Sequence, residues 1–171
     1  MYTIQEHIHR YSVWTAARAA QRGLKDFTIQ NLKIILENIS FKNKVENYIK
    51  SDINKMNYEL FHKQVANDII KNGSKLKIDI TYGRASKIIS IYLKTAVVIP
   101  NNAKGNASNI IHAPIDSILL KALSKEYKKT NWGKLTWTKF TENDYWDLIK
   151  DLEKNNLPIN WKLEEYWNPE D

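Results

Sequence analysis

The chain contains no cysteine. This absence excludes disulfide-stabilised scaffolds, thiolate zinc sites, iron–sulfur clusters and cysteine nucleophiles. Glycine and proline are scarce as well, with 5 and 4 residues in a chain of 171. Because these residues are the strongest breakers of regular structure, their scarcity predicts helices joined by modest loops.

Long apolar runs are also missing. The longest, over residues 88–99, is interrupted by Ser90, Lys94 and Thr95, and it is shorter than the ~20 residues that span a bilayer. The first ten residues lack the apolar segment of a secretory signal. These features predict a soluble, cytoplasmic protein without a membrane partner. The length is typical of one domain, which we expect to cover residues 1–171.

Positive charge is present in excess, and it is unevenly distributed. Residues 1–140 hold 23 Lys+Arg and 10 Asp+Glu, a net charge of +13, whereas residues 141–171 hold 3 and 9, a net charge of −6. A basic body indicates a polyanionic partner, and nucleic acid is the usual one. We expect the acidic segment either to lie away from the polyanion, available to a protein partner, or to fold back and mask part of the basic body.

The spacing of apolar residues predicts an all-α fold, a compact bundle of about six to seven helices. The expected helices cover residues 11–22, 28–39, 55–71, 84–98, 114–129, 141–153 and 161–167. Thr28 is expected to cap its helix, and Thr141 with Asp144 fits a capping box. Pro114 stands where the first turn of a helix tolerates proline. Residues 75–81 alternate and fit either a short strand or an extended connector, and residues 101–109 are expected to form an exposed loop.

The helix that follows Gly83 is unusually apolar, yet Arg84, Lys87 and Lys94 fall on one of its stripes. A lysine held against apolar walls loses hydration, which lowers its pKa and makes the neutral amine available as a nucleophile. The alternative is a basic stripe at the rim of a core helix, with its side chains reaching to water.

Asp116 follows the segment Ile111-His112-Ala113-Pro114-Ile115 near the start of another expected helix. A carboxylate there is stabilised in its charged form by the free N–H groups of the first turn. Facing a cleft, such a carboxylate steadies a developing cation or activates water. The alternative is an ordinary acidic residue in a first helical turn.

Together these segments resemble the helix-hairpin-helix base-excision DNA glycosylases, most closely their archaeal 8-oxoguanine branch. The likeness lies in Gly83-Arg84-Ala85-Ser86-Lys87-Ile88-Ile89-Ser90-Ile91-Tyr92-Leu93-Lys94, followed by Ala113-Pro114-Ile115-Asp116, within residues 60–125. The resemblance implies a glycosylase-like helical fold and DNA, rather than RNA, as the partner. It also implies that Lys87 attacks the sugar carbon as the base leaves and that Asp116 assists. Lys94 matches a second lysine of the archaeal branch, and we expect Arg84 and Lys94 to contact the nucleic acid.

The sequence departs from the family at the hairpin. In place of a Leu-Pro-Gly-hydrophobic-Gly signature it has Ile80-Thr81-Tyr82-Gly83, with a single glycine. An alignment on Gly83-Arg84 puts Ala85 in the position of the lysine, which would leave no such nucleophile. A helical protein that binds DNA or RNA without chemistry, as an accessory of a repair or defence assembly, is the alternative function.

Two further clusters combine basic and aromatic residues, a composition that suits phosphates and unstacked bases. One cluster lies within residues 127–140 and contains Lys128, Lys129, Trp132, Lys134, Trp137 and Lys139. The other is Arg18 and Arg22, four residues apart near Trp14. Alternatively, the tryptophans anchor a loop to the core and the arginines form a solvated helix surface.

No cofactor and no metal are expected. The chain has no glycine-rich phosphate loop and no dinucleotide-binding fingerprint. His7 and His9, taken with His62 or His112, show no spacing of a known ligand set. Any catalysis by this chain therefore depends on lysine and carboxylate.

Overall fold

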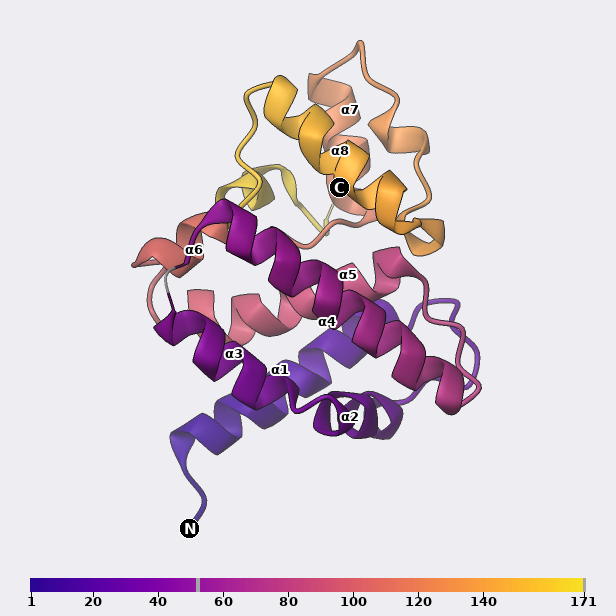
Figure 1. Cartoon of the computed structure of the whole chain (residues 1–171). Helices are drawn as coiled ribbons and strands as arrows, with labels where there is room; N and C mark the ends of the chain where they lie inside the picture. Colours follow the sequence, from indigo (N-terminus) through magenta and orange to yellow (C-terminus); the bar gives the residue numbers. More distant parts are fainter. Residues whose placement is uncertain (52, 171) are drawn as a thin grey trace.

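The computed structural model describes residues 1–51 and 53–170, and these residues form helices and loops with no β-strand (Figure 1). The longer helices are α1 (Ile4–Ala20), α2 (Ile29–Asn38), α3 (Phe41–Lys50), α4 (Lys55–Lys75), α5 (Tyr82–Leu93), α7 (Ser117–Glu126) and α8 (Glu142–Lys154). The shorter elements are the π-helical turn η1 (Lys94–Val98), α6 (Asn106–Ile110) and the 3₁₀ turns η2 (Trp132–Lys134), η3 (Trp137–Lys139) and η4 (Trp161–Tyr166). The all-α prediction is confirmed.

Helix α5 lies in the middle of the molecule, with α7 and α8 on one side and α1, α2 and α3 on the other (Figure 1). Every residue of α5 except Ile91 is buried, as expected for a helix that is surrounded by others. Its main neighbours are α1 and α4. In α1 the fully buried Ala16, Ala17 and Ala20 have short side chains, so the two helices pack closely.

Two predicted helix starts are confirmed. Thr28 caps α2, because its side chain accepts from the backbone N–H of Asn31 while the Asn31 side chain binds the Thr28 backbone. Thr141 caps α8 in the same way with Asp144. Both are reciprocal capping boxes, in which two otherwise unpaired backbone donors are satisfied.

One predicted helix start is wrong, and two helices were not predicted. Helix α1 begins at Ile4 rather than at residue 11, because Thr3 caps it by accepting from the Glu6 backbone. The whole of α3 was not predicted, since Ser40 before it has a positive φ and makes no capping hydrogen bond. Helix α6 (Asn106–Ile110) overlaps the end of the stretch expected to be a loop, residues 101–109.

The connection from α4 to α5 also differs from the prediction. Helix α4 continues to Lys75 instead of ending at residue 71, with Gly73 inside it because a side chain there would meet Ile80. Residues 76–77 then form a turn and residues 78–81 a connector outside any helix or strand, which agrees with the connector of the two alternatives and not with the strand. Helix α5 begins at Tyr82, capped by Thr81, and residues 94–98 form the turn η1 instead of continuing the α-helix.

Pro114 does not start a helix, contrary to the prediction. Helix α7 begins three residues later, and Asp116 is its N-cap in an extended conformation. The helix ends at Glu126, before Lys129. None of the helices in the described residues is long and apolar enough to cross a membrane.

Candidate functional site

Lys87 and Asp116, the pair singled out in the sequence, are in direct contact. The Lys87 Nζ atom lies 2.8 Å from Asp116 Oδ2, although the residues are 29 positions apart. The exposed fractions of the two side chains are 6% and 15%. The fold therefore places an amine and a carboxylate in one largely buried site.

Three hydrogen-bond donors hold the Asp116 carboxylate. Oδ1 accepts from the backbone N–H of Leu119 at 2.9 Å, as an N-cap does, and Oδ2 accepts from Lys87. Oδ2 also accepts from the indole Nε1 of Trp167 at 3.0 Å. Because the carboxylate is bound from a helix N-terminus, a lysine and an indole, its orientation is fixed.

Burial affects the two groups differently. It lowers the pKa of Lys87, and the neighbouring Asp116 only partly offsets this effect. Burial alone would raise the pKa of Asp116, but the Lys87 ammonium and the donors from Leu119 and Trp167 outweigh it, so the pKa lies below its usual value. An amine that is easier to deprotonate thus faces a carboxylate that stays charged.

The start of α5 is locked against η3, and this contact positions Lys87. A Cβ atom at Gly83 would lie 1.9 Å from the Trp137 carbonyl oxygen, so only glycine fits there. The Gly83 backbone N–H donates to the Phe140 carbonyl at 3.1 Å, and Thr81 Oγ1 donates to the Thr138 carbonyl at 2.8 Å. As a result the Trp137 ring lies 5.6 Å from Lys87 Nζ.

Arg84 and Lys94, the other two residues of the stripe, have different surroundings. Arg84 is buried, donates to the Ala20 carbonyl at 2.5 Å and lies 5.9 Å from the Trp137 ring, so it joins α5 to the end of α1. Lys94 is partly exposed and forms an ion pair with Glu164 of η4, with Nζ 2.6 Å from Oε1. Only Lys94 of these two reaches the surface.

The acidic segment folds back onto this region, which was one of the two alternatives. Glu164 binds Lys94 and Trp167 binds Asp116, so residues 161–167 lie over both lysines of the stripe. In Figure 1 the C-terminal part of the chain returns toward the middle of the molecule. A groove of about 730 Å³ adjoins the contact, and its lining includes Lys94, Ile99, Pro158 and Glu164.

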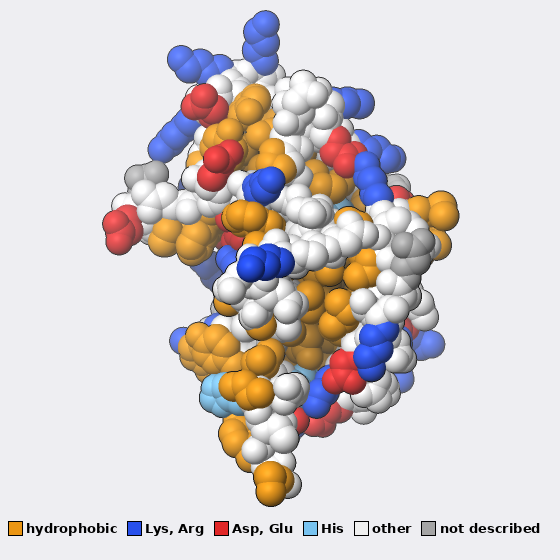
Figure 2. All heavy atoms as spheres, turned by 90° about the vertical axis from the view of Figure 1, so that its left-hand side faces the viewer, with side chains coloured by type: hydrophobic (Ala, Val, Ile, Leu, Met, Phe, Trp, Pro, Cys, Tyr) orange, Lys and Arg blue, Asp and Glu red, His pale blue; other side chains and the backbone are white. Residues whose placement is uncertain are grey.

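The aromatic and basic residues after α7 are divided between the core and the surface. Trp132 and Trp137 are buried, and the Trp132 indole donates to Asp151 Oδ2 at 2.7 Å. This is the anchoring role that the sequence left open, and it leaves neither ring face free for a base. Exposed lysines surround them at positions 128, 129, 134 and 139. The loop after α7 lies at the top of Figure 1, where Figure 2 shows Lys and Arg side chains projecting outward.

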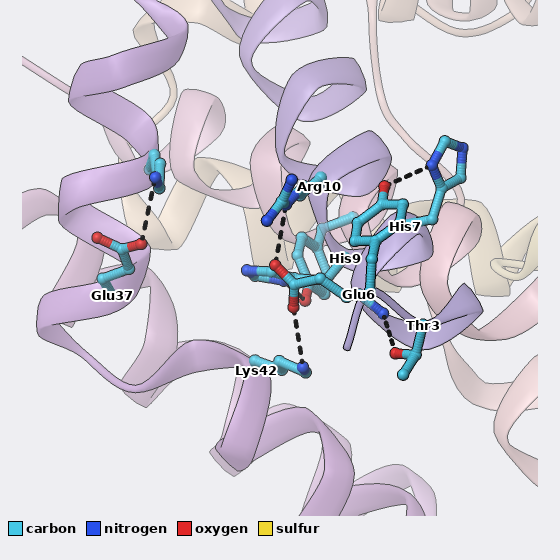
Figure 3. A network of polar contacts seen from close by, with 10 residues as sticks. Thr3, Glu6, His7, His9, Arg10, Glu37 and Lys42 are labelled. Carbon is cyan, nitrogen blue, oxygen red and sulfur yellow. Dashed lines mark hydrogen bonds and ion pairs between the residues drawn. The ribbon is translucent and has the colours of Figure 1, made fainter.

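The histidines do not gather in one place. His7 and His9 are on α1, where His7 pairs with Tyr2 and His9 with Tyr92, each at 2.7 Å (Figure 3). The same figure shows Glu6 bound by Arg10 and by Lys42 of α3. No group of three or more metal-binding side chains lies within residues 1–51 and 53–170.

His62 and His112 instead belong to a buried aromatic cluster that the sequence analysis missed. The cluster joins α4, α5 and α8 and comprises Tyr58, His62, Tyr82, His112, Tyr145 and Trp146. Burial lowers the pKa of His62 to about 3 and that of His112 well below its usual value. His62 Nε2 has no hydrogen-bond partner among the described residues. No sequence spacing joins these residues, which come from four separate segments.

Comparison with known proteins adds no relative, because no family model, curated protein or solved structure matches this chain. The assignment of a function therefore depends on the site itself.

Proposed function

We propose that the chain is a base-excision DNA N-glycosylase of the helix-hairpin-helix type, with Lys87 as nucleophile and Asp116 as assisting carboxylate. The observation that supports this most directly is the 2.8 Å contact between Lys87 Nζ and Asp116 Oδ2 in a largely buried site. The resemblance of residues 83–94 and 113–116 to that family suggests the same two residues.

Lys87 reacts as the neutral amine, a form that its lowered pKa favours, after it has lost a proton to solvent. The amine attacks C1′ of the deoxyribose while the charged Asp116 stabilises the positive charge that develops on the sugar, and the N-glycosidic bond breaks with its electron pair on the base. The base takes a proton from solvent. A proton then passes from the new C1′–N group to O4′ as the sugar ring opens, leaving a Schiff base between Lys87 and the sugar. Water hydrolyses this intermediate and restores the lysine.

Access to the pair requires that the acidic segment moves. Trp167 donates to the same Oδ2 atom that accepts from Lys87, and Glu164 holds Lys94 at the neighbouring turn. An extruded nucleotide would have to displace both contacts to bring its C1′ atom to Lys87. Extrusion costs a few kcal/mol and selects weakened or damaged base pairs. The exposed lysines after α7 would neutralise phosphates of the flanking duplex.

The test is covalent trapping. Duplexes that each carry one damaged base are incubated with the protein and borohydride, which reduces a Schiff base to a stable amine. We expect an adduct with at least one lesion and none with Lys87→Ala. Lys87→Arg keeps the positive charge beside Asp116 without a nucleophilic amine and serves where the alanine variant does not fold. Lys150→Ala, an exposed position on α8, is the matched control and should retain the adduct.

An adduct that survives in a folded Lys87 variant would assign the nucleophile to another residue. The absence of any adduct across the lesion panel would remove the glycosylase proposal altogether.

Binding of nucleic acid without chemistry is the second candidate, and the exposed lysines after α7 favour it. Lys128, Lys129, Lys134 and Lys139 form no ion pair within the part of the chain that the structure describes. Charge reversal at Lys128 and Lys134 should weaken binding to all sequences and lower the salt slope by about one per lost phosphate contact. Under this alternative no lesion yields an adduct, yet the salt dependence remains.

A further inference from the structure

The outer surface of α1 carries an exposed pair of stacked aromatic rings. Tyr11 and Trp14 are three residues apart, and their ring centroids are 5.7 Å apart with planes inclined by 21°. Their exposed fractions are 51% and 46%, whereas Trp132, Trp137 and Trp146 are buried. A flat aromatic surface of this kind is open to solvent and is not used by the core.

Two arginines extend this surface toward the end of the helix. Arg18 follows Trp14 by four residues on α1, which makes their side chains neighbours, and Arg22 lies in the turn two residues beyond the last helical residue, Ala20. Both are exposed. Neither forms an ion pair within residues 1–51 and 53–170, so both guanidinium groups are available to an anion.

Negative charge is sparse around this row. Residues 7–25 contain no Asp or Glu but include Arg10, Arg18, Arg22 and Lys25, and Asp26 follows directly. The nearest carboxylate along the helix is that of Glu6, which Arg10 and Lys42 already bind at 2.9 Å and 3.5 Å (Figure 3). The row therefore combines apolar rings with unneutralised positive charge, and an anionic ligand with flat apolar groups complements both.

The opposite face of α1 is packed in the core, which fixes the row outward. Val13, Ala16 and Ala17 are buried against the bundle. The Thr15 hydroxyl lies 3.4 Å from that of Thr95, which immediately follows Lys94 in the chain. The aromatic pair thus stands on a rigid helix beside η1, at the end of α5.

We infer that Tyr11, Trp14, Arg18 and Arg22 form a binding site for unpaired nucleotides, with bases stacked on the two rings and phosphates bound by the arginines. Such a site suits a single strand because a duplex keeps its base faces covered, whereas every unpaired base offers a face to stack on. Over residues 11–20 the helix α1 extends roughly 15 Å, a length that accommodates a few nucleotides.

The inference depends on the proposal that this chain binds nucleic acid, but not on chemistry at Lys87. It adds that the strand state matters: an unpaired or opened segment would be held on α1, close to the turn that carries Lys94. A damaged duplex that has been opened locally provides such a segment.

The experiment measures fluorescence anisotropy of labelled (dT)12, of the matching ribo-oligomer and of a blunt 12-base-pair duplex with the full-length protein. We expect the single strands to bind more tightly than the duplex, and the tighter of the two identifies the preferred sugar. Tyr11→Ala/Trp14→Ala should weaken single-strand binding roughly tenfold or more, the loss expected for stacked bases. Trp14→Phe should restore most of it, because a ring face remains.

The controls separate stacking from general surface effects. Leu60→Ala removes an exposed apolar side chain from α4, and Lys33→Ala removes an exposed positive charge from α2. Both variants should leave the affinity for single strands unchanged. Arg18→Ala/Arg22→Ala should weaken binding and lower the salt slope. Far-UV circular dichroism confirms that each variant is folded, which is expected since all these side chains lie on the surface.

Three results would overturn the inference: equal affinity of the wild type for duplex and single strand, unchanged binding in Tyr11→Ala/Trp14→Ala, or an equal loss in Leu60→Ala. A change from dimer to monomer in the aromatic variant, with oligonucleotide affinity unchanged, would assign the surface to a second copy of the chain instead. Because this assay is independent of borohydride trapping, it can succeed where the glycosylase proposal fails, and the reverse.

Discussion

Two lysines seven residues apart, Lys87 of α5 and Lys94 of the turn that follows it, each form an ion pair with a carboxylate, and the two pairs differ in their surroundings. Lys87–Asp116 joins a core helix to the N-cap of α7, and the exposed fractions of its side chains are 6% and 15%. Lys94–Glu164 joins the π-helical turn η1 to the 3₁₀ turn η4, and its lysine is 30% exposed. The first pair has a carboxylate bound by three donors, whereas the second joins a partly exposed lysine to a carboxylate for which Lys94 is the one ion-pair partner in the described residues. The same two types of charged group thus form a buried site in one case and a contact near the surface in the other.

The largest expected difference between the pairs is in stability. Lys87→Ala leaves Asp116 in a mostly buried position without its cation, and removal of one partner of a buried pair typically costs about 3–5 kcal/mol. Urea denaturation should show a loss of this order, and Lys87→Met/Asp116→Leu should recover much of it because no buried charge remains. A loss below 1 kcal/mol for Lys87→Ala would mean that the two pairs are equivalent.

The pH dependence of stability distinguishes the Lys87–Asp116 pair from the buried histidines. His62 and His112 have pKa values lowered by burial, so the unfolded chain binds protons that the folded chain does not, and stability falls as the pH drops below about 6.5. The decrease should approach 1.4 kcal/mol per pH unit for each histidine.

Asp116 acts in a lower range. Its folded pKa is below the usual value, so its contribution is complete above that usual value, near 4, and is lost as the pH falls through the folded pKa. Thermal unfolding is measured between pH 7 and 3. The dependence of stability on pH should be shallower near pH 6 for His62→Phe, whereas for Asp116→Asn this dependence should change only at the acid end of the range. An altered slope near pH 6 in Asp116→Asn would contradict this separation.

A smaller effect is expected at Trp167, whose indole binds Asp116 of the Lys87–Asp116 pair. Trp167→Phe removes the 3.0 Å hydrogen bond to Asp116 while a ring is retained, and hydrogen bonds to charged groups contribute about 1.5–3 kcal/mol at most. We expect faster labelling of Lys87 by a small amine reagent, followed by peptide mass spectrometry. Labelling of Lys150 in the same sample is the internal control and should not change. Equal Lys87 labelling in both proteins would show that Trp167 does not restrict access.

The smallest effect should come from the outer pair. Lys94→Ala or Glu164→Gln removes an ion pair that is partly solvated, which costs about 0–1 kcal/mol. Glu164→Gln should nevertheless raise duplex affinity measured by anisotropy, because it frees Lys94 and removes a negative charge from the binding face. Glu165→Gln, an exposed neighbour, is the matched control for charge. A larger gain in duplex affinity for Glu165→Gln would show that the increase comes from the loss of negative charge as such, and not from the release of Lys94.

How far the sequence predicted this molecule depends on whether the signal was local. The capping boxes at Thr28 and Thr141 were predictable, since each needs only residues three positions apart. Helix α3 was not, because it has no capping side chain and is stabilised by ring contacts such as that of Tyr48 with Phe61 of α4. The N-cap role of Asp116 had a usable signal, since an aspartate before an apolar helical run is a common N-cap.

The candidate site shows the same division. The approach of Lys87 to Asp116 was suggested by the resemblance, and the contact is now described. The hydrogen bond from the Trp167 indole to the same carboxylate could not be predicted, because Trp167 is 51 residues away from Asp116 and no periodicity connects its segment to α7. Likewise, the burial of Trp132 and Trp137 depends on tertiary packing, which composition does not report.

The absence of a side chain at Gly83 brings the surface segment η3 into direct contact with the helix that carries Lys87. The backbone of α5 meets that of η3 there without any intervening atoms, and hydrogen bonds on either side join the two segments. Lys139 belongs to η3, and Lys87 lies in the second turn of α5. The surface lysine and the buried amine are therefore carried by two segments that meet backbone to backbone.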